Sequence, residues 1–87
     1  MKAKHLKIIC SVLKQPAQPG LSWKDIESAF IAIGAEVTEG RGSRVRVKLN
    51  GVKAVFHRPH PRKEADKGAV ASVRKFFIEA GVENVDI

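Results

Sequence analysis

At 87 residues, of which 44% are hydrophobic, the chain is expected to form one small domain with a modest core. A formal net charge of +7 indicates an anionic partner, such as nucleic acid, an anionic membrane surface or an acidic protein. The single cysteine excludes a disulfide framework and a Cys-based zinc site, and no apolar run reaches the roughly 20 residues of a membrane span. We therefore expect a cytoplasmic protein without a membrane partner.

The N-terminal segment predicts a helix and then a linker. Between Lys2 and Lys14, apolar residues recur at helical spacing and form a broad stripe. Two prolines and a glycine between residues 15 and 20 then end the helix and separate it from the next element.

A second helix is predicted from Trp23 to Ile33, with Ser22 as its N-cap. Its apolar residues lie on one face, which is typical of a helix packed on a core. A short strand is expected over 36–38, and a glycine-rich turn at 39–42.

The clearest element is a β-hairpin between residues 42 and 61. Two segments rich in Val and Leu flank Asn50-Gly51, the dipeptide most typical of a two-residue hairpin turn. Such a turn fixes the register and places Arg44 opposite His57. Because side chains alternate across a strand, one face of the hairpin is apolar and the other is basic. The basic face carries Arg44, Arg46, Lys48, Lys53, Val55 and His57.

The positive charge is concentrated on this hairpin. From Arg41 to Lys63, eight of 23 residues are Lys or Arg and none is Asp or Glu. After a charged loop at 62–66, a last helix is predicted from Asp66 or Lys67 to Ala80. The expected fold is therefore α+β, in the order α-α-β-β-β-α. Its helices cover one face of a three-stranded antiparallel sheet and leave the basic face in water.

The basic face offers groups for cleaving an RNA phosphodiester. A ribose 2′-hydroxyl attacks its own phosphate when one group removes its proton and another protonates the leaving oxygen, and histidine suits both roles. His57 beside Arg44 fits this scheme, because a guanidinium stabilises the charge of the transition state. The alternative is a face that only binds RNA, with His57 as one polar contact. His57 and His60 have no Cys or paired carboxylate nearby in sequence, so no metal or other cofactor is expected.

Several short motifs succeed one another in a distinctive order. They are Leu21-Ser22-Trp23-Lys24-Asp25-Ile26 at the start of a helix, an Ile-Gly-Ala-Glu segment, Gly42-Ser43-Arg44 before a short hairpin, His60-Pro61, and Ala80-Gly81-Val82 after the closing helix. This order resembles the HicA family of toxins from bacterial toxin–antitoxin systems. The resemblance implies a fold like a double-stranded-RNA-binding domain, an endoribonuclease that cleaves mRNA, and a HicB-type antitoxin that neutralises it.

The resemblance also implies a division of the chain. The toxin domain would span residues 21–87, preceded by a separate segment, 1–20, that holds the N-terminal helix and the proline linker. That helix is expected either to pack on the domain or to contact a second copy, as a homodimer, or the antitoxin.

One motif departs from the family. The usual Gly-Ser-His motif places a catalytic histidine where this chain has Arg44. Because the predicted register sets His57 about 5 Å from Arg44 between Cβ atoms, we expect His57 to replace that histidine and Arg44 to bind phosphate. His60 is a second catalytic candidate, since it matches the family's His-Pro element. A non-catalytic RNA-binding module of the same fold is the alternative. The other expected RNA contacts are Arg41, Ser43, Arg46, Lys48, Lys53 and Arg58.

Overall fold

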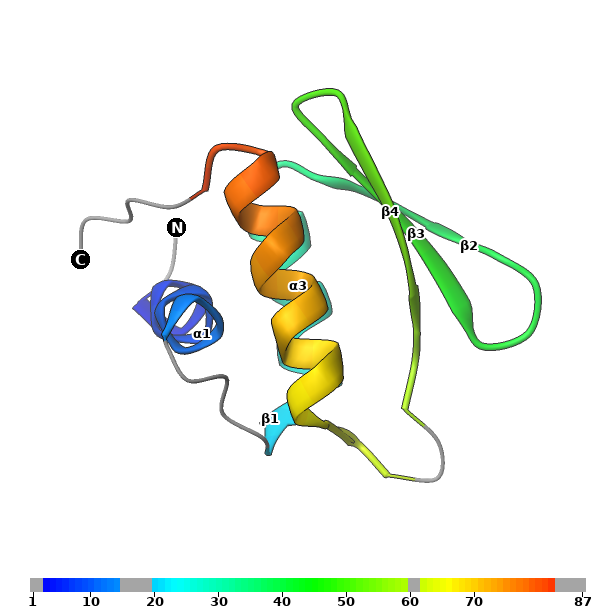
Figure 1. Cartoon of the computed structure of the whole chain (residues 1–87), viewed down its shortest axis with the longest axis horizontal. Helices are drawn as coiled ribbons and strands as arrows, with labels where there is room; N and C mark the ends of the chain where they lie inside the picture. Colours follow the sequence, from blue (N-terminus) through cyan, green and yellow to red (C-terminus); the bar gives the residue numbers. More distant parts are fainter. Residues whose placement is uncertain (1–2, 15–19, 60–61, 83–87) are drawn as a thin grey trace.

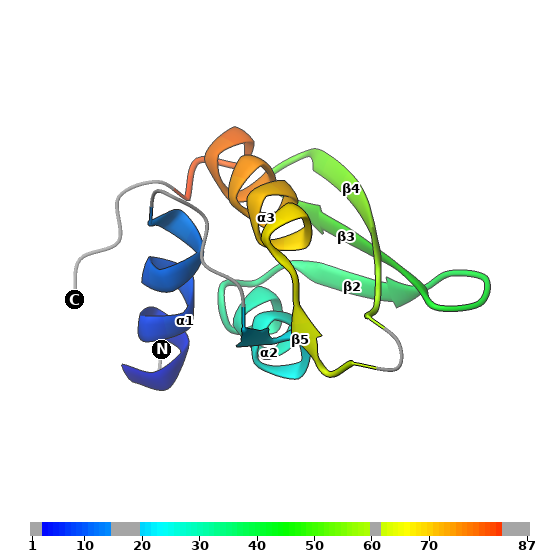
Figure 2. The same ribbon diagram turned by 60° about the horizontal axis from the view of Figure 1, so that its bottom comes forward.

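The computed structural model describes residues 3–14, 20–59 and 62–82, and they form three layers. An antiparallel sheet packs on two helices, and the N-terminal helix packs on the other side of those helices (Figures 1 and 2). The predicted α+β fold and its element order are confirmed. The elements are α1 (Ala3–Leu13), α2 (Trp23–Ala32), α3 (Lys67–Glu79), and the sheet strands β2 (Glu36–Glu39), β3 (Arg44–Leu49) and β4 (Val52–His57).

The predicted hairpin is confirmed residue by residue. Strands β3 and β4 pair with Arg44 opposite His57 and Leu49 opposite Val52, and β2 adds to the other edge of β3. Asn50 has φ 52° and Gly51 has φ 81°, the two positive values that a two-residue hairpin turn of this kind requires.

A second sheet was not predicted. Strand β1 (Leu21–Ser22) pairs antiparallel with β5 (Glu64–Ala65), so the prediction of a loop throughout 62–66 is wrong. Strands of two residues are too short to show alternation, and their partners are far apart in sequence. The pairing ties the start of α2 to the start of α3.

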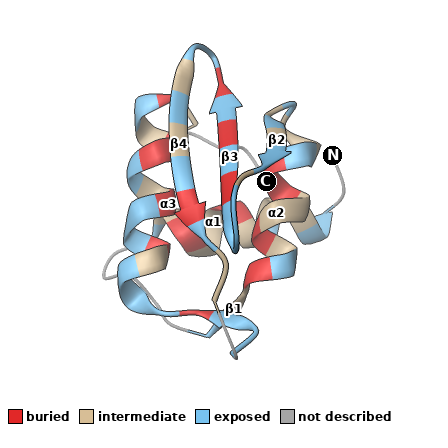
Figure 3. Ribbon diagram, turned by 90° about the vertical axis from the view of Figure 1, so that its right-hand side faces the viewer, coloured by how far each residue is buried: buried red, intermediate tan, exposed pale blue. Residues whose placement is uncertain are grey.

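The core lies between the sheet and the helices. Buried and exposed residues alternate along β3, as Figure 3 shows, and the buried side faces the helices. Phe56 of β4 stacks on Phe30 of α2 with ring centroids 5.6 Å apart, and Phe76 of α3 meets both rings edge-on. This aromatic contact fixes the position of β4, the strand that ends in His57.

The two helices beneath the sheet begin differently. The Asp66 side chain accepts a 2.8 Å hydrogen bond from the Ala69 amide and so caps α3. Ser22 is the N-cap residue of α2, as predicted, but its side chain makes no capping hydrogen bond. Instead the Trp23 amide donates to the Lys63 carbonyl at 2.9 Å, just before β5.

Helix α1 shares the core of the other layers. Ile9 and Val12 are fully buried in the same cluster as residues of α2 and α3. The apolar stripe predicted for this helix is therefore used within the molecule. The domain division at residue 20 and the homodimer contact remain predictions. No helix among the described residues is long and apolar enough to span a membrane.

Candidate nucleic-acid interface

The open face of the sheet is basic and uncovered by the described helices. In Figure 3 the helices lie behind β3 and β4, and the near side of the sheet faces the viewer. The pairing places Lys48 directly opposite Lys53, a like-charge pair that destabilises the free sheet and that an anion would relieve. Every residue predicted for this face is exposed: Arg44, Arg46, Lys48, Lys53, Val55 and His57.

Arg44 and His57 meet at the end of this face. The Arg44 Nε–H donates a hydrogen bond to His57 Nε2 at 3.3 Å, and both side chains are exposed. A nitrogen that accepts this bond carries no proton, so the proton of the neutral ring lies on Nδ1. The pair presents one cation and one base to solvent, side by side.

The turn before β3 adjoins this pair. Arg41 and Ser43 are exposed in the turn, and the Ser43 carbonyl accepts a 2.8 Å hydrogen bond from the Arg58 amide, one residue after His57. The turn and the end of β4 are therefore joined. His60 lies outside the described residues.

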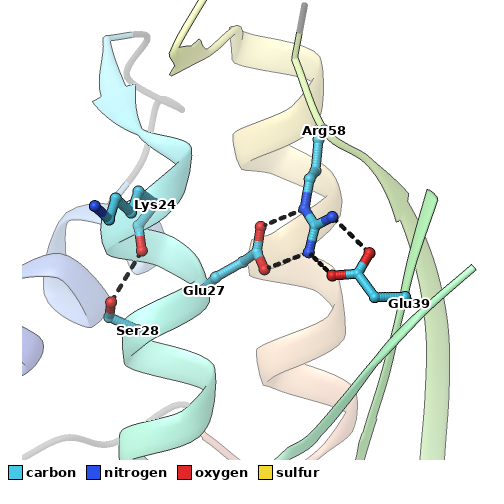
Figure 4. Close-up of polar contacts among 5 residues, drawn as sticks. All are labelled: Lys24, Glu27, Ser28, Glu39 and Arg58. Atoms are coloured by element: carbon cyan, nitrogen blue, oxygen red, sulfur yellow. Dashed lines mark hydrogen bonds and ion pairs between the residues drawn. The ribbon is translucent and has the colours of Figure 1, made fainter. Parts of the chain in front are cut away.

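Arg58 differs from the other predicted RNA contacts. Strand alternation turns its side chain to the helix side, where it lies between Glu27 of α2 and Glu39 of β2 (Figure 4). Hydrogen bonds to Glu27 and Glu39 raise the pKa of Arg58, and the bonds from Arg58 lower the pKa of Glu39. Two carboxylates and one guanidinium carry a net charge of −1, so this cluster does not attract phosphate. Nothing in the local sequence identifies these partners.

A pocket opens beside His57. It has a volume of about 530 Å³ and lies between the end of β4 and the first turns of α3, with Trp23 and Phe56 on its wall. This volume is within the range of ligand pockets. Within the described ranges, no group of three His, Cys, Asp or Glu residues is placed to hold a metal ion.

The sequence also matches a known family. Residues 23–82 match the family described as the HicA toxin of bacterial toxin–antitoxin systems. The chain belongs to the HicA family. This confirms the predicted resemblance, and it implies a cognate antitoxin as partner. The match runs from the start of α2 to just beyond α3, so α1 lies outside it. Searches of curated proteins and of solved structures gave no match.

Proposed function

We propose that this HicA-family toxin is a cytoplasmic endoribonuclease that cleaves mRNA, with His57 and Arg44 at the reacting phosphate. The observation that supports this most directly is the 3.3 Å contact between Arg44 Nε and His57 Nε2 on an exposed cationic face. A base beside a phosphate-binding cation supplies two of the groups that 2′-hydroxyl attack on a phosphodiester uses.

In the proposed mechanism, Arg44 first binds a non-bridging oxygen of the scissile phosphate. This releases His57 Nε2, which accepts the proton of the 2′-hydroxyl. The 2′-oxygen attacks phosphorus, and the 5′-oxygen leaves with a proton from a second acid. The products are a 2′,3′-cyclic phosphate and a 5′-hydroxyl. His60 stays the sequence candidate for the second acid, and no step of this scheme uses a metal.

The rest of the basic face would bind the RNA backbone. Arg41 and Ser43 lie next to the reacting pair, and Arg46, Lys48 and Lys53 continue along the strands. Apart from the imidazole of His57, the described residues of this face carry no aromatic ring, so binding rests mainly on phosphate contacts rather than on base stacking. An antitoxin that inhibits the toxin would present carboxylates to the same cations.

Cleavage of a short single-stranded RNA tests the proposal. His57→Ala should lower kcat by about 100-fold or more, as loss of a general base does. RNA with a single 2′-deoxy substitution at the cleaved position should stay intact, and the products should carry cyclic phosphate ends. EDTA should leave the rate unchanged. A His57→Ala variant that cleaves RNA and arrests bacterial growth as well as the parent would contradict the proposal.

A non-catalytic RNA-binding module is the second candidate. It is favoured by Arg44, which stands where the family motif has its histidine. In that case the protein would bind the RNA and leave it intact. His57→Ala would weaken RNA binding, and neither the parent nor the variant would cleave RNA.

A further inference from the structure

We propose that Arg58, Glu27 and Glu39 form a clamp that positions His57 against Arg44, so that all three are positioning residues for RNA cleavage. This inference rests on the proposed function, because it concerns the same reacting pair. It differs from the sequence prediction for Arg58, which was a direct contact with RNA.

The clamp is held by four hydrogen bonds. Arg58 Nε and Nη2 donate to the two carboxylate oxygens of Glu27 at 2.8 and 2.9 Å. Arg58 Nη1 and Nη2 donate to the two oxygens of Glu39 at 2.6 and 2.7 Å. Four of the five N–H donors of the guanidinium are thus engaged, in two bidentate pairs (Figure 4). Such a fork is geometrically specific, so it fixes Arg58 in one orientation.

The position of the clamp links it to the reacting pair. Arg58 directly succeeds His57 in the chain, and its own amide donates to the Ser43 carbonyl, next to Arg44. Glu39 ends β2 and precedes the turn that leads to Arg44. The same guanidinium therefore joins the end of β4, which carries His57, to the end of β2, where Glu39 lies opposite Val45, the residue after Arg44.

The clamp acts where the backbone ladder ends. Arg44 opposite His57 is the last pair of the β3–β4 register, and Pro59 has no amide hydrogen to extend it. The exposed pair has one contact of 3.3 Å between its own side chains. Backbone hydrogen bonds from the Arg58 amide to the Ser43 carbonyl and from the Gly40 amide to the Arg44 carbonyl hold the main chain here. Without the clamp, this end of the sheet would depend on those backbone bonds, and the distance between the two side-chain groups would vary more. Misplacement of a reacting group by about 1 Å costs as much as 100-fold in rate.

Glu27 connects the clamp to the body of the protein. Its side chain is about one-fifth exposed and projects from α2, the helix whose Phe30 stacks on Phe56 of β4. Arg58 directly follows β4, so its guanidinium joins that end of the sheet to a helix that the core fixes. Through Glu27, the clamp limits the motion of the exposed end of the sheet relative to the core.

Two substitutions distinguish a role of the clamp in positioning His57 from an effect of its charge on RNA binding. Arg58→Lys keeps the charge but loses the fork, because a lysine ammonium cannot make two bidentate pairs. Glu39→Gln removes a negative charge, which by electrostatics alone would strengthen RNA binding. Glu36→Gln makes the same change on the same strand, at an exposed residue with no ion pair among the described residues, and serves as the control.

Kinetics on a short RNA give the first measurement, at a temperature where every variant is shown to be folded. We expect Arg58→Lys and Glu39→Gln to lower kcat by about tenfold with KM within about twofold of the parent. Glu36→Gln should leave kcat within about twofold. A raised KM with unchanged kcat in Arg58→Lys would mean that Arg58 binds substrate, and a parental rate would mean that its charge suffices. Either result would overturn the clamp.

Nuclear Overhauser contacts between the Arg44 side chain and the His57 ring give a measurement that does not need activity. They should weaken in Arg58→Lys and Glu39→Gln and persist in Glu36→Gln. If the parent cleaves no RNA, the proposed function fails and this measurement alone decides the clamp. Unchanged contacts in both clamp variants would then reject it.

Discussion

Asn50 in the hairpin turn donates a 2.7 Å hydrogen bond from its side-chain amide to the carbonyl of Ala80, at the end of α3. Ala80 provides one of the last helix carbonyls, which have no partner within the helix. The residue that shapes the turn therefore also fastens the tip of the hairpin to α3. The two ends of the basic face are fixed in different ways, the tip by Asn50 and the other end by Arg58.

Substitution of Asn50 should separate these two roles. Asn50→Gly accepts the positive φ but loses the donor, so the free energy of unfolding should fall by about 1 kcal/mol. Asn50→Asp also tolerates the turn, but it sets a negative charge against a helix C-terminal carbonyl and should lose about 1–2 kcal/mol. Urea unfolding at neutral pH measures both. An aspartate variant more stable than the glycine variant would contradict this role.

Local patterns predicted most of the fold. The spacing of apolar residues indicated all three helices, and Asn50-Gly51 fixed the register that brings Arg44 to His57. Those signals lie within a few residues of each other, and the structure confirms them. The pair β1–β5 gave no such signal, because each strand has two residues and the partners are more than 40 positions apart.

The clamp could not be predicted for a related reason. Arg58 lies in a run of basic residues, so its local sequence favours a phosphate contact. Its partners Glu27 and Glu39 are 31 and 19 positions away, on a helix and on another strand. Only the packing of α2 against the sheet brings the three together.

The clamp should also make stability depend on pH. Hydrogen bonds from Arg58 hold the pKa of Glu39 below its ordinary value of 4.5 in the folded state. Its contribution to stability is therefore present above that ordinary value and is lost as the pH falls through the lowered pKa. Thermal unfolding between pH 3 and 7 should show a smaller loss of stability on acidification for Glu39→Gln than for the parent. An equal loss of stability on acidification in the parent and in Glu39→Gln would contradict this prediction.

The register allows Arg44 and His57 to be exchanged. The two residues lie directly opposite each other on the same face, and the resemblance to the HicA family implies a histidine at the position of Arg44. The double variant Arg44→His with His57→Arg should therefore recover at least about tenfold of the activity lost in His57→Ala. Cleavage of a short RNA measures the recovery. A double variant no more active than His57→Ala would show that the two positions are not equivalent.

RNA affinity should depend on salt through the basic face. Each phosphate contact to a single strand contributes about −0.7 to the slope of log K against log salt concentration. Arg46→Gln should make that slope less steep by about 0.7 units, measured with uncleavable 2′-deoxy RNA. Lys7→Gln, an exposed change on α1 in the layer farthest from the sheet, should leave the slope unchanged. Equal effects of the two changes would indicate that binding is not confined to this face.

Helix α1 should unfold together with the rest of the protein, although the family match does not include it. Ile9 is fully buried between the helices, whereas Ile31 on α2 is 65% exposed. Ile9→Ala should lower the free energy of unfolding by about 2–4 kcal/mol, because it removes core contacts and leaves a cavity. Ile31→Ala removes the same atoms from the surface and should change stability by about 0.5 kcal/mol or less. Urea unfolding of both variants should show one transition. A separate early transition in Ile9→Ala would instead mean that α1 unfolds independently of the other layers.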